Sequence, residues 1–244
     1  MKRRPVENVP ELAYPTCEGE PLPEGEVLAS GTLRAGELMR ERDVIERWEM
    51  RRRGCVYVAT VRQQWASQVT DVEVIFDLEW TPLRAWKRMM IPGARTPPDT
   101  RLYELRNDPP TMSTDAEHVD GVEHREFAGR NPIAVVGPGR ALLAAWVRAA
   151  NLEVGDVARG NVLDFRQLVE RIEEVALRRD PDRDDPELGR VRVYTVFGRE
   201  SFFVNEEGWV VGDLAGLRDE SVVSAPAPEE LPVPAADPST PLAN

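Results

Sequence analysis

The sequence predicts an α+β fold, mainly an antiparallel curved β-sheet of half-barrel-like shape with one or two covering helices. Residues 71–80 alternate between apolar and charged side chains, which is the pattern of a strand with one covered and one solvated face. Residues 55–65 are rich in β-branched and aromatic side chains, which favours strand over helix. Three short extended runs joined by tight turns occupy residues 191–211. Together these observations predict an antiparallel sheet.

The N-terminal half predicts a meander. Strands are expected at residues 26–33, at 44–50 with a turn over 51–54, and at 55–65, and a loop at 66–70 leads into the strand at 71–80. In that strand Val72, Val74, Phe76, Leu78 and Trp80 are expected to share the apolar face. Because Pro82 has no backbone N–H to donate, the strand must end, bulge or run along an edge there, and residues 83–91 resume it.

The middle of the chain predicts both strands and a helix. Residues 101–106 suit a short strand, and residues 117–127 suit a hairpin about Asp120-Gly121. Residues 139–150 form the clearest helix, with an apolar stripe that ends at Asn151. Residues 164–179 fit a helix face through Phe165, Leu168, Ile172 and Val175 but also a strand, and we expect helix first and strand later. Residues 182–185 are expected in a charged loop.

The domain organisation predicted is an extended arm (1–25), a single β-rich domain (26–218) and a proline-rich tail (219–244). The tail carries six prolines after residue 224 without any Lys or Arg, so we expect a solvated, polyproline II-like or disordered segment.

Charge and hydropathy exclude several classes of partner. The chain has 244 residues and a net charge of −12, which disfavours nucleic acid as a partner because that binding depends on Lys and Arg. No stretch is apolar enough to span a bilayer, and the basic start lacks the apolar region of a secretory signal. With Cys17 and Cys55 expected as free thiols, the sequence predicts a cytoplasmic protein.

Catalytic and metal signatures are weak, so we lean against an enzyme and expect no cofactor. No Gly-x-Ser-x-Gly elbow occurs, and the segment 137–140 reads as a helix start rather than a phosphate loop. The acidic row at positions 71, 73, 77 and 79 could supply an acid and a base, although a solvated strand face is the preferred interpretation. His118 and His124 would pair with Glu123 and Glu117 on opposite faces of their hairpin, so we expect no metal site.

The aromatic side chains suggest a ligand site. Large rings are expected to meet on the covered face of the sheet, where burial in a core would also explain them. A curved sheet with few helices can leave an apolar cleft. The expected ligand-binding residues are Trp65, Phe76, Trp80, Trp86, Met89, Trp146 and Trp209.

The order of motifs resembles a known family. The sequence reads Val-x-Val-x-Phe-Asp-x-x-Trp-x-Pro-Leu at 72–83, Arg-x-Tyr-x-Val at 192–196 and Phe-Phe-Val-Asn-Glu-Glu-Gly-Trp-Val-Val at 202–211. These segments resemble the LolA-like lipoprotein carriers over roughly residues 25–217. The resemblance implies a half-open β-barrel that shelters acyl chains. The missing secretory signal departs from the family, whose carriers work outside the cytoplasm.

We therefore expect non-catalytic binding of a lipid or other apolar small molecule in a cleft of the sheet. The alternative is a structural or assembly subunit that uses the same apolar face and the terminal arms to contact a protein partner or another copy of the chain. An enzyme with an unrecognised site is the third option.

Overall fold

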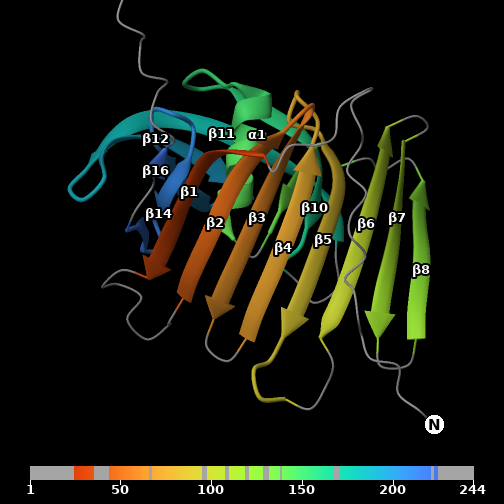
Figure 1. The fold of residues 1–244 in the computed structure, drawn as a ribbon. Helices are drawn as coiled ribbons and strands as arrows, with labels where there is room; N and C mark the ends of the chain where they lie inside the picture. The colour runs from red at the N-terminus through yellow and green to blue at the C-terminus, as the bar shows by residue number, and fades with distance from the viewer. Residues whose placement is uncertain are drawn as a thin grey trace, which may run out of the picture.

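The computed structural model describes residues 25–35, 44–65, 68–94, 98–107, 110–118, 121–128, 132–137, 139–166, 171–220 and 223–224. These residues form one curved, mostly antiparallel sheet with a single α-helix (Figure 1). The antiparallel sheet predicted from the alternating patterns is therefore confirmed.

The strands follow one another mainly as hairpins, and a short 3-10 turn leads into the helix. Their bounds are β1 (Glu26–Ala35), β2 (Val44–Arg53), β3 (Val56–Trp65), β4 (Gln68–Phe76), β5 (Pro82–Met90), β6 (Asp99–Asn107), β7 (Pro110–His118), β8 (Gly121–Ala128), β9 (Ala134–Val136), η2 (Arg140–Leu142), α1 (Leu143–Ala150), β10 (Val157–Asp164), β11 (Arg171–Asp185), β12 (Gly189–Val196), β13 (Glu200–Val204), β14 (Val210–Asp213), β15 (Leu217–Asp219) and β16 (Val223–Ser224).

The strand order runs from β8 back to β1, crosses to β15, and continues through β14 to β9. The crossing from β1 to β15 is antiparallel and joins the N-terminal half of the sheet to the C-terminal half. Only the pairing of β9 with β10 is parallel among the strand pairs described. The remaining strand, β16, pairs with β1.

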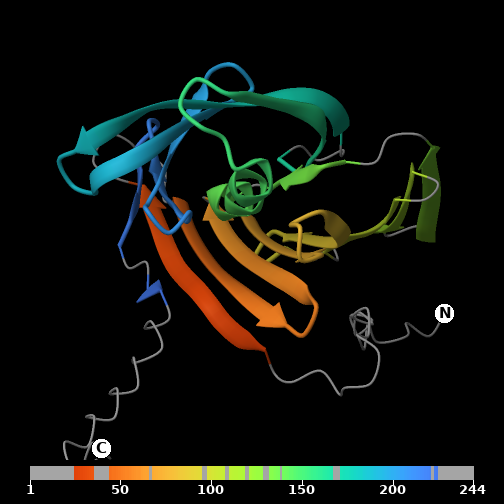
Figure 2. The same ribbon diagram turned by 90° about the horizontal axis from the view of Figure 1, so that it is seen from above.

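The sheet curves so that its two halves face each other, with α1 between them (Figure 2). Strands β1 to β4 lie on one side of the helix, and β11 and β12 lie on the other. We call the concave space between the two halves the trough. Its walls carry the main apolar core, which includes Val74 and Phe76 of β4, Val196 of β12 and Phe202 of β13.

The strand expected at 71–80 ends earlier than its alternation suggests. β4 stops at Phe76, and Asp77 to Thr81 form a turn before β5. Leu78 is consequently exposed rather than on the apolar face. The strand also begins earlier, at Gln68, because it forms a tight hairpin with β3.

The prediction of a helix at the start of residues 164–179 is wrong for the described part of that segment. Residues 157–164 and 171–185 form the antiparallel hairpin β10–β11, in which Ile172 and Val175 pair with residues of β10. The charged loop expected at 182–185 is also wrong, since these residues belong to β11. The pairing of β11 with β12 shifts register between Asp180 and Arg183, and Pro181 lies within this bulge, where a proline is tolerated.

The pairing of β7 with β8 is centred one residue earlier than the Asp120-Gly121 turn predicts. His118 lies opposite Gly121, Glu117 opposite Val122, and Asp115 opposite His124. The predicted pairings of His118 with Glu123 and of Glu117 with His124 are therefore wrong. No group of three or more metal-ligating residues occurs in the described part of the chain.

Cys55 is disulfide-bonded, so the expectation of free thiols is wrong. Cys17, the other cysteine of the sequence, lies outside the described residues, as do the arm before residue 25 and the tail beyond residue 224. A disulfide is typical of oxidising compartments, so one of the two reasons for predicting a cytoplasmic protein is removed. No helix in the described ranges is long and apolar enough to cross a membrane.

Candidate functional site

The trough is filled by the chain's own helix. Every residue from Ala141 to Val147 is at most 5% exposed, so η2 and the first part of α1 are buried on all sides, whereas Ala149 in the last turn is exposed. Such a pattern is typical of a helix inside a protein core. The helix predicted at residues 139–150 is therefore present as the 3-10 turn η2 followed by α1, and it ends at Asn151, which has a left-handed backbone.

Aromatic rings gather where the helix ends. The guanidinium carbon of Arg148 lies 3.9 Å from the ring centroid of Trp209 and 5.3 Å from that of Trp80. Trp80 in turn stacks on Tyr57 of β3, with centroids 4.0 Å apart and planes within 7°. Trp48 of β2 contacts the other side of this group, 5.7 Å from Trp209 between centroids. We call these five residues the aromatic end of the trough.

Arg148 fastens the helix at this end. Its guanidinium group donates to the backbone carbonyl of Glu207 in the turn before β14. Burial lowers the pKa of Arg148, partly offset by Tyr57 and Glu207, but an arginine stays charged at any physiological pH. A positive charge is therefore held between aromatic faces, which attract cations.

Trp80 is held in an unusual backbone conformation. Its φ is 66°, in the left-handed region that residues other than glycine seldom adopt. The turn is fixed by Asp77, whose carboxylate accepts hydrogen bonds from the backbone N–H groups of Glu79 and Thr81 at 3.0 and 2.7 Å. The sharp turn directs the Trp80 ring onto Tyr57.

The structure brings together part of the expected site. Phe76, Trp80 and Trp209 meet near the helix end, since Phe76 lies 6.3 Å from Trp80 between centroids, and Trp146 is buried on the helix itself. The other three residues lie elsewhere. Trp65 is 51% exposed at the end of β3, Trp86 faces outward beside Glu73, and Met89 is half-buried towards the end of β5. Their role in ligand binding stays a prediction.

Two buried indole groups of the trough lack hydrogen-bond partners. The Nε1 atoms of Trp48 and Trp146 are inaccessible to water and have no acceptor among the described residues. A buried donor without an acceptor costs about 1–3 kcal/mol. The packing is nevertheless tight, because a Cβ added at Gly31 would lie 2.8 Å from the Trp48 Nε1 atom.

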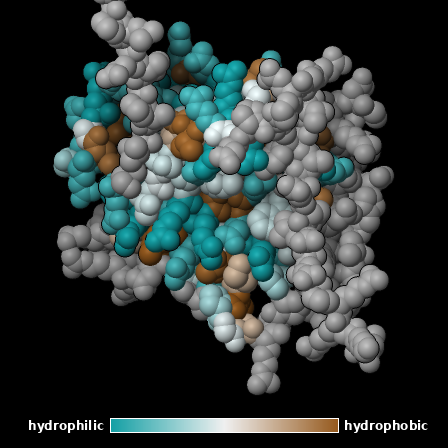
Figure 3. All heavy atoms as spheres, in the orientation of Figure 1, coloured by the Kyte–Doolittle hydropathy of each residue, from teal (hydrophilic) through white to brown (hydrophobic). Residues whose placement is uncertain are grey.

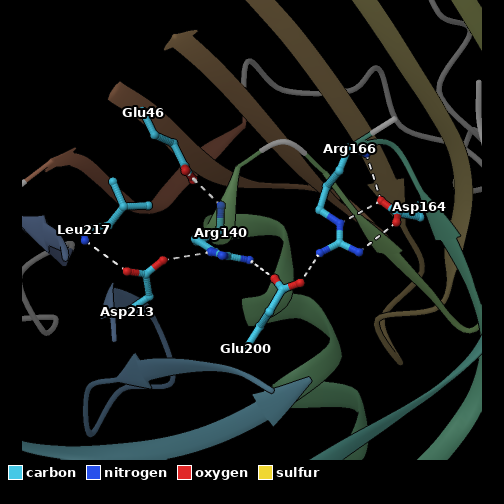
Figure 4. A network of polar contacts seen from close by, with 7 residues as sticks. All are labelled: Glu46, Arg140, Asp164, Arg166, Glu200, Asp213 and Leu217. Atoms are coloured by element: carbon cyan, nitrogen blue, oxygen red, sulfur yellow. Dashed lines mark hydrogen bonds and ion pairs between the residues drawn. The ribbon is translucent and has the colours of Figure 1, made fainter. Parts of the chain in front are cut away.

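A polar network holds the opposite end of the trough, where the helix begins (Figure 4). Glu46 of β2 is fully buried, and its two carboxyl oxygens accept hydrogen bonds from the backbone N–H groups of Arg140 and Ala141, each at 2.8 Å. Burial raises the pKa of Glu46, the two backbone hydrogen bonds lower it, and the result is a pKa of about 7.

The network continues across the trough through arginines. Arg140 donates to Asp213 of β14 at 3.0 Å and to Glu200 of β13 at 2.9 Å. The second oxygen of Glu200 accepts from Arg166 at 2.7 Å, and Arg166 also forms two side-chain hydrogen bonds with Asp164 of β10. Burial disfavours the charged form of Arg166, but its bonds to Asp164 and Glu200 more than compensate and raise its pKa.

The sequence interpretation missed this network. One signal was present: Glu46 shares a strand face with Val44, Trp48 and Met50, and a carboxylate on an apolar face needs partners. The other members come from segments far apart in the chain. Their convergence depends on the strand order, which the sequence patterns did not predict.

The convex face of the sheet differs from the trough. In the described part it is mostly hydrophilic, with separated apolar patches (Figure 3). A hollow of about 390 Å³ lies there, and it is lined by Arg47, Trp48, Glu49, Thr60, Val61, Arg62, Asp71, Val72, Glu73 and Trp86.

The members of the acidic row have different partners. Asp71 forms an ion pair with Arg62 at 3.6 Å, and Asp77 holds the turn around Trp80. Burial raises the pKa of Glu73, opposed by Arg53. Asp71 and Glu73 line the same hollow but face different arginines, and a solvated strand face stays the preferred interpretation of the row.

No family model matches the sequence, and no curated protein matches it. Among solved structures, the chain is similar to a DUF1089 family protein from Pseudomonas aeruginosa, with a TM-score of 0.47 and 15% identity over 69% of this chain and 88% of that chain. It is also similar to a beta-barrel-like protein of DUF1849 from Brucella abortus, with a TM-score of 0.44 and 10% identity over 80% and 88%. The resemblance to the LolA-like carriers stays a prediction.

Proposed function

We propose that the protein binds an apolar small molecule, non-covalently, in the trough that α1 fills in this structure. The proposed ligand has a long apolar body and an oxygen atom that accepts a hydrogen bond, as in a fatty ester. To admit it, the helix must shift away from part of the aromatic wall.

The observation that carries this proposal is the pair of buried indole groups, Trp48 and Trp146, without acceptors among the described residues. Native proteins contain few such groups, and each one calls for an explanation. A ligand oxygen that reaches the Nε1 atom of Trp146 would remove the penalty of that donor. The form in which the helix fills the trough then carries the free-energy cost of an unpaired indole N–H, and the ligand-bound form does not.

The shape of the trough supports the same proposal. Aromatic and aliphatic side chains line it on both sides, which suits an apolar ligand. The helix that fills it has only eight residues, and a helix of that length depends on its packing for stability. Its two ends are fastened by polar contacts, at Glu46 and at Arg148, rather than by covalent links.

The direct test is a fluorescence titration with methyl cis-parinarate, an apolar ester with a carbonyl acceptor and no titratable group. We expect saturable binding of one molecule per chain, weaker binding of diphenylhexatriene, which lacks an acceptor, and weaker binding of the ester by Trp146→Phe. A lost hydrogen bond worth about 0.5–1.5 kcal/mol corresponds to a loss of roughly twofold to tenfold in affinity.

The matched control is Trp65→Phe, because Trp65 is largely exposed outside the trough. It should bind the ester as the unchanged protein does. The proposal is overturned if the folded protein shows no saturable binding, or if both tryptophan variants bind equally well.

A second candidate function is assembly, and the open edge of the sheet favours it. β8 ends the strand order and pairs only with β7 among the described strands. The free side of such a strand presents unpaired backbone groups to another chain. Light scattering over a concentration series tests this: a mass that rises to a dimer supports assembly, and a monomer throughout contradicts self-association.

A further inference from the structure

The contact between Glu46 and the helix start is close and leaves no room for water. Both oxygens of Glu46 accept backbone N–H groups, from Arg140 and Ala141. The backbone approaches so closely that a Cβ added at Gly139 would lie 2.7 Å from a Glu46 oxygen and 2.5 Å from Val61. Glu46 is itself 0% exposed. A movement of η2 away from β2 therefore breaks both of these hydrogen bonds.

The groups around Glu46 do not neutralise it fully. The charged residues that face it are Arg140 from η2, which favours its ionised form, and Asp213 from β14, which disfavours it. Arg140 is shared with Asp213 and Glu200. The neighbouring strands β1 and β3 place Leu33 and Gln63 opposite Glu46, and neither carries a charge.

We propose that Glu46 is a pH-sensitive latch on the start of α1, and that release of its proton favours an open form in which the trough admits its ligand. This inference rests on the proposed function, because it describes how access to the same trough is controlled. In the closed form each oxygen accepts one N–H group and the carboxyl group keeps its proton. In the open form the carboxylate is hydrated and ionised.

The direction of the pH effect follows from the two forms. The pKa of Glu46 is about 7 when the carboxyl is buried, against 4.5 when it is free in water. At a pH between 4.5 and about 7, the closed form therefore holds a proton that the open form has released. Opening is favoured as the pH rises, by up to about tenfold per pH unit between pH 5 and 7, and levels off above the upper value.

Hydrogen exchange of the backbone amides measures the latch without any ligand. After correction for the intrinsic effect of pH on exchange, the protection of α1 amides should fall steeply from pH 5 to pH 7 and then level off. Low urea concentrations should leave this exchange unchanged, because a local opening exposes little surface. Amides of β4, such as those of Val72 and Val74, serve as the reference for global unfolding.

The variant Glu46→Gln should remove the pH dependence in α1, and Glu79→Gln, an exposed carboxylate in the β4–β5 turn, should leave it intact. If Glu46→Gln fails to fold, the ¹³C signal of the Glu46 carboxyl in the unchanged protein should still titrate near pH 7. The latch is overturned if α1 protection does not change with pH, or if urea accelerates α1 exchange as it does in β4. A working latch without methyl cis-parinarate binding would instead refute only the proposed function.

Discussion

Arg148 lies on the face of Trp209, with 3.9 Å between its guanidinium carbon and the ring centroid. Arg148 belongs to the last turn of the helix and Trp209 to the turn before β14, so this contact ties the helix to the C-terminal half of the sheet. Because Trp80 approaches Arg148 from the N-terminal half, one side chain links both walls of the trough.

Replacing Arg148 with lysine keeps the charge but removes the flat group that stacks on the rings. We expect Arg148→Lys to lower the free energy of unfolding by about 1 kcal/mol, the size of a partly buried cation–π contact. Urea denaturation measures this. Arg159→Lys, at an exposed site on β10, should cost almost nothing. Equal stability of both variants would mean that the stacked geometry contributes nothing.

Trp80 has a ring that stacks on Tyr57 and a backbone conformation that is unfavourable for most residues, and two substitutions separate these effects. Trp80→Asn and Trp80→Ala both remove the stack on Tyr57. Asparagine tolerates a φ of 66° better than alanine does. The asparagine variant should therefore be the more stable by about 0.5–1 kcal/mol in thermal or urea unfolding. If the alanine variant is as stable as the asparagine variant, the backbone at residue 80 relaxes when the ring is removed.

Glu200 should stabilise the fold at neutral pH and lose that effect in acid. Burial alone would raise the pKa of Glu200, but hydrogen bonds from Arg140 and Arg166 outweigh it and hold the pKa below the usual 4.5. A depressed folded pKa means that the stabilisation is present above 4.5 and is lost as the pH falls through the lower folded value.

The variant Glu200→Gln should therefore cost about 1–3 kcal/mol at pH 7 and flatten the acid limb of the stability curve. Urea midpoints measured from pH 3 to pH 7 check both effects. Glu153→Gln, an exposed carboxylate after the helix, should keep the acid limb of the unchanged protein. A Glu200→Gln variant with an unaltered acid limb would refute the role assigned to the arginine bridge.

Gly139 is required for the close approach of the helix start to β2 and β3. We expect Gly139→Ala to destabilise the protein by about 1–3 kcal/mol, as extra atoms in a packed core do. Since the nearest obstacle is a Val61 methyl group, Val61→Ala should relieve part of that cost when the two changes are combined. A double-mutant cycle measures this coupling, and strictly additive effects would show that the clash is not with Val61.

Sequence pattern predicted β3 from its β-branched and aromatic content, most of β4 from period-two alternation, and β12 to β14 from the tight turns between them. The prediction failed in β11, where the sequence also fits a helix or a loop. Ile172 and Val175 are spaced as on a helix, yet they belong to β11, where pairing with β10 determines the conformation. The acidic residues at 182–185 resemble a loop but continue the same strand past a bulge, since pairing with β12 supplies their backbone partners.

The candidate site was predictable only in part for a related reason. Phe76, Trp80, Trp146 and Trp209 were singled out as large apolar rings, and all lie in or beside the trough. Trp86 was expected with them but faces outward, because its register position beside Glu73 places it on the convex face. The hydrogen-bond partners of Glu46 could not be predicted, since the N–H groups of Arg140 and Ala141 belong to η2, 94 and 95 residues further along the chain.

The pairing of β1 with β15 joins the two halves of the sheet, and this seam bears on how the chain folds. β1 and β15 meet in three residue pairs, Leu33 with Asp219, Arg34 with Arg218 and Ala35 with Leu217, and these strands come from opposite ends of the described chain. Each half can form from neighbouring hairpins, whereas the seam must bring together segments that are remote in sequence, which slows folding. We therefore expect closure of the seam to be the slow event, so that a newly made chain stays incomplete until its last strands emerge.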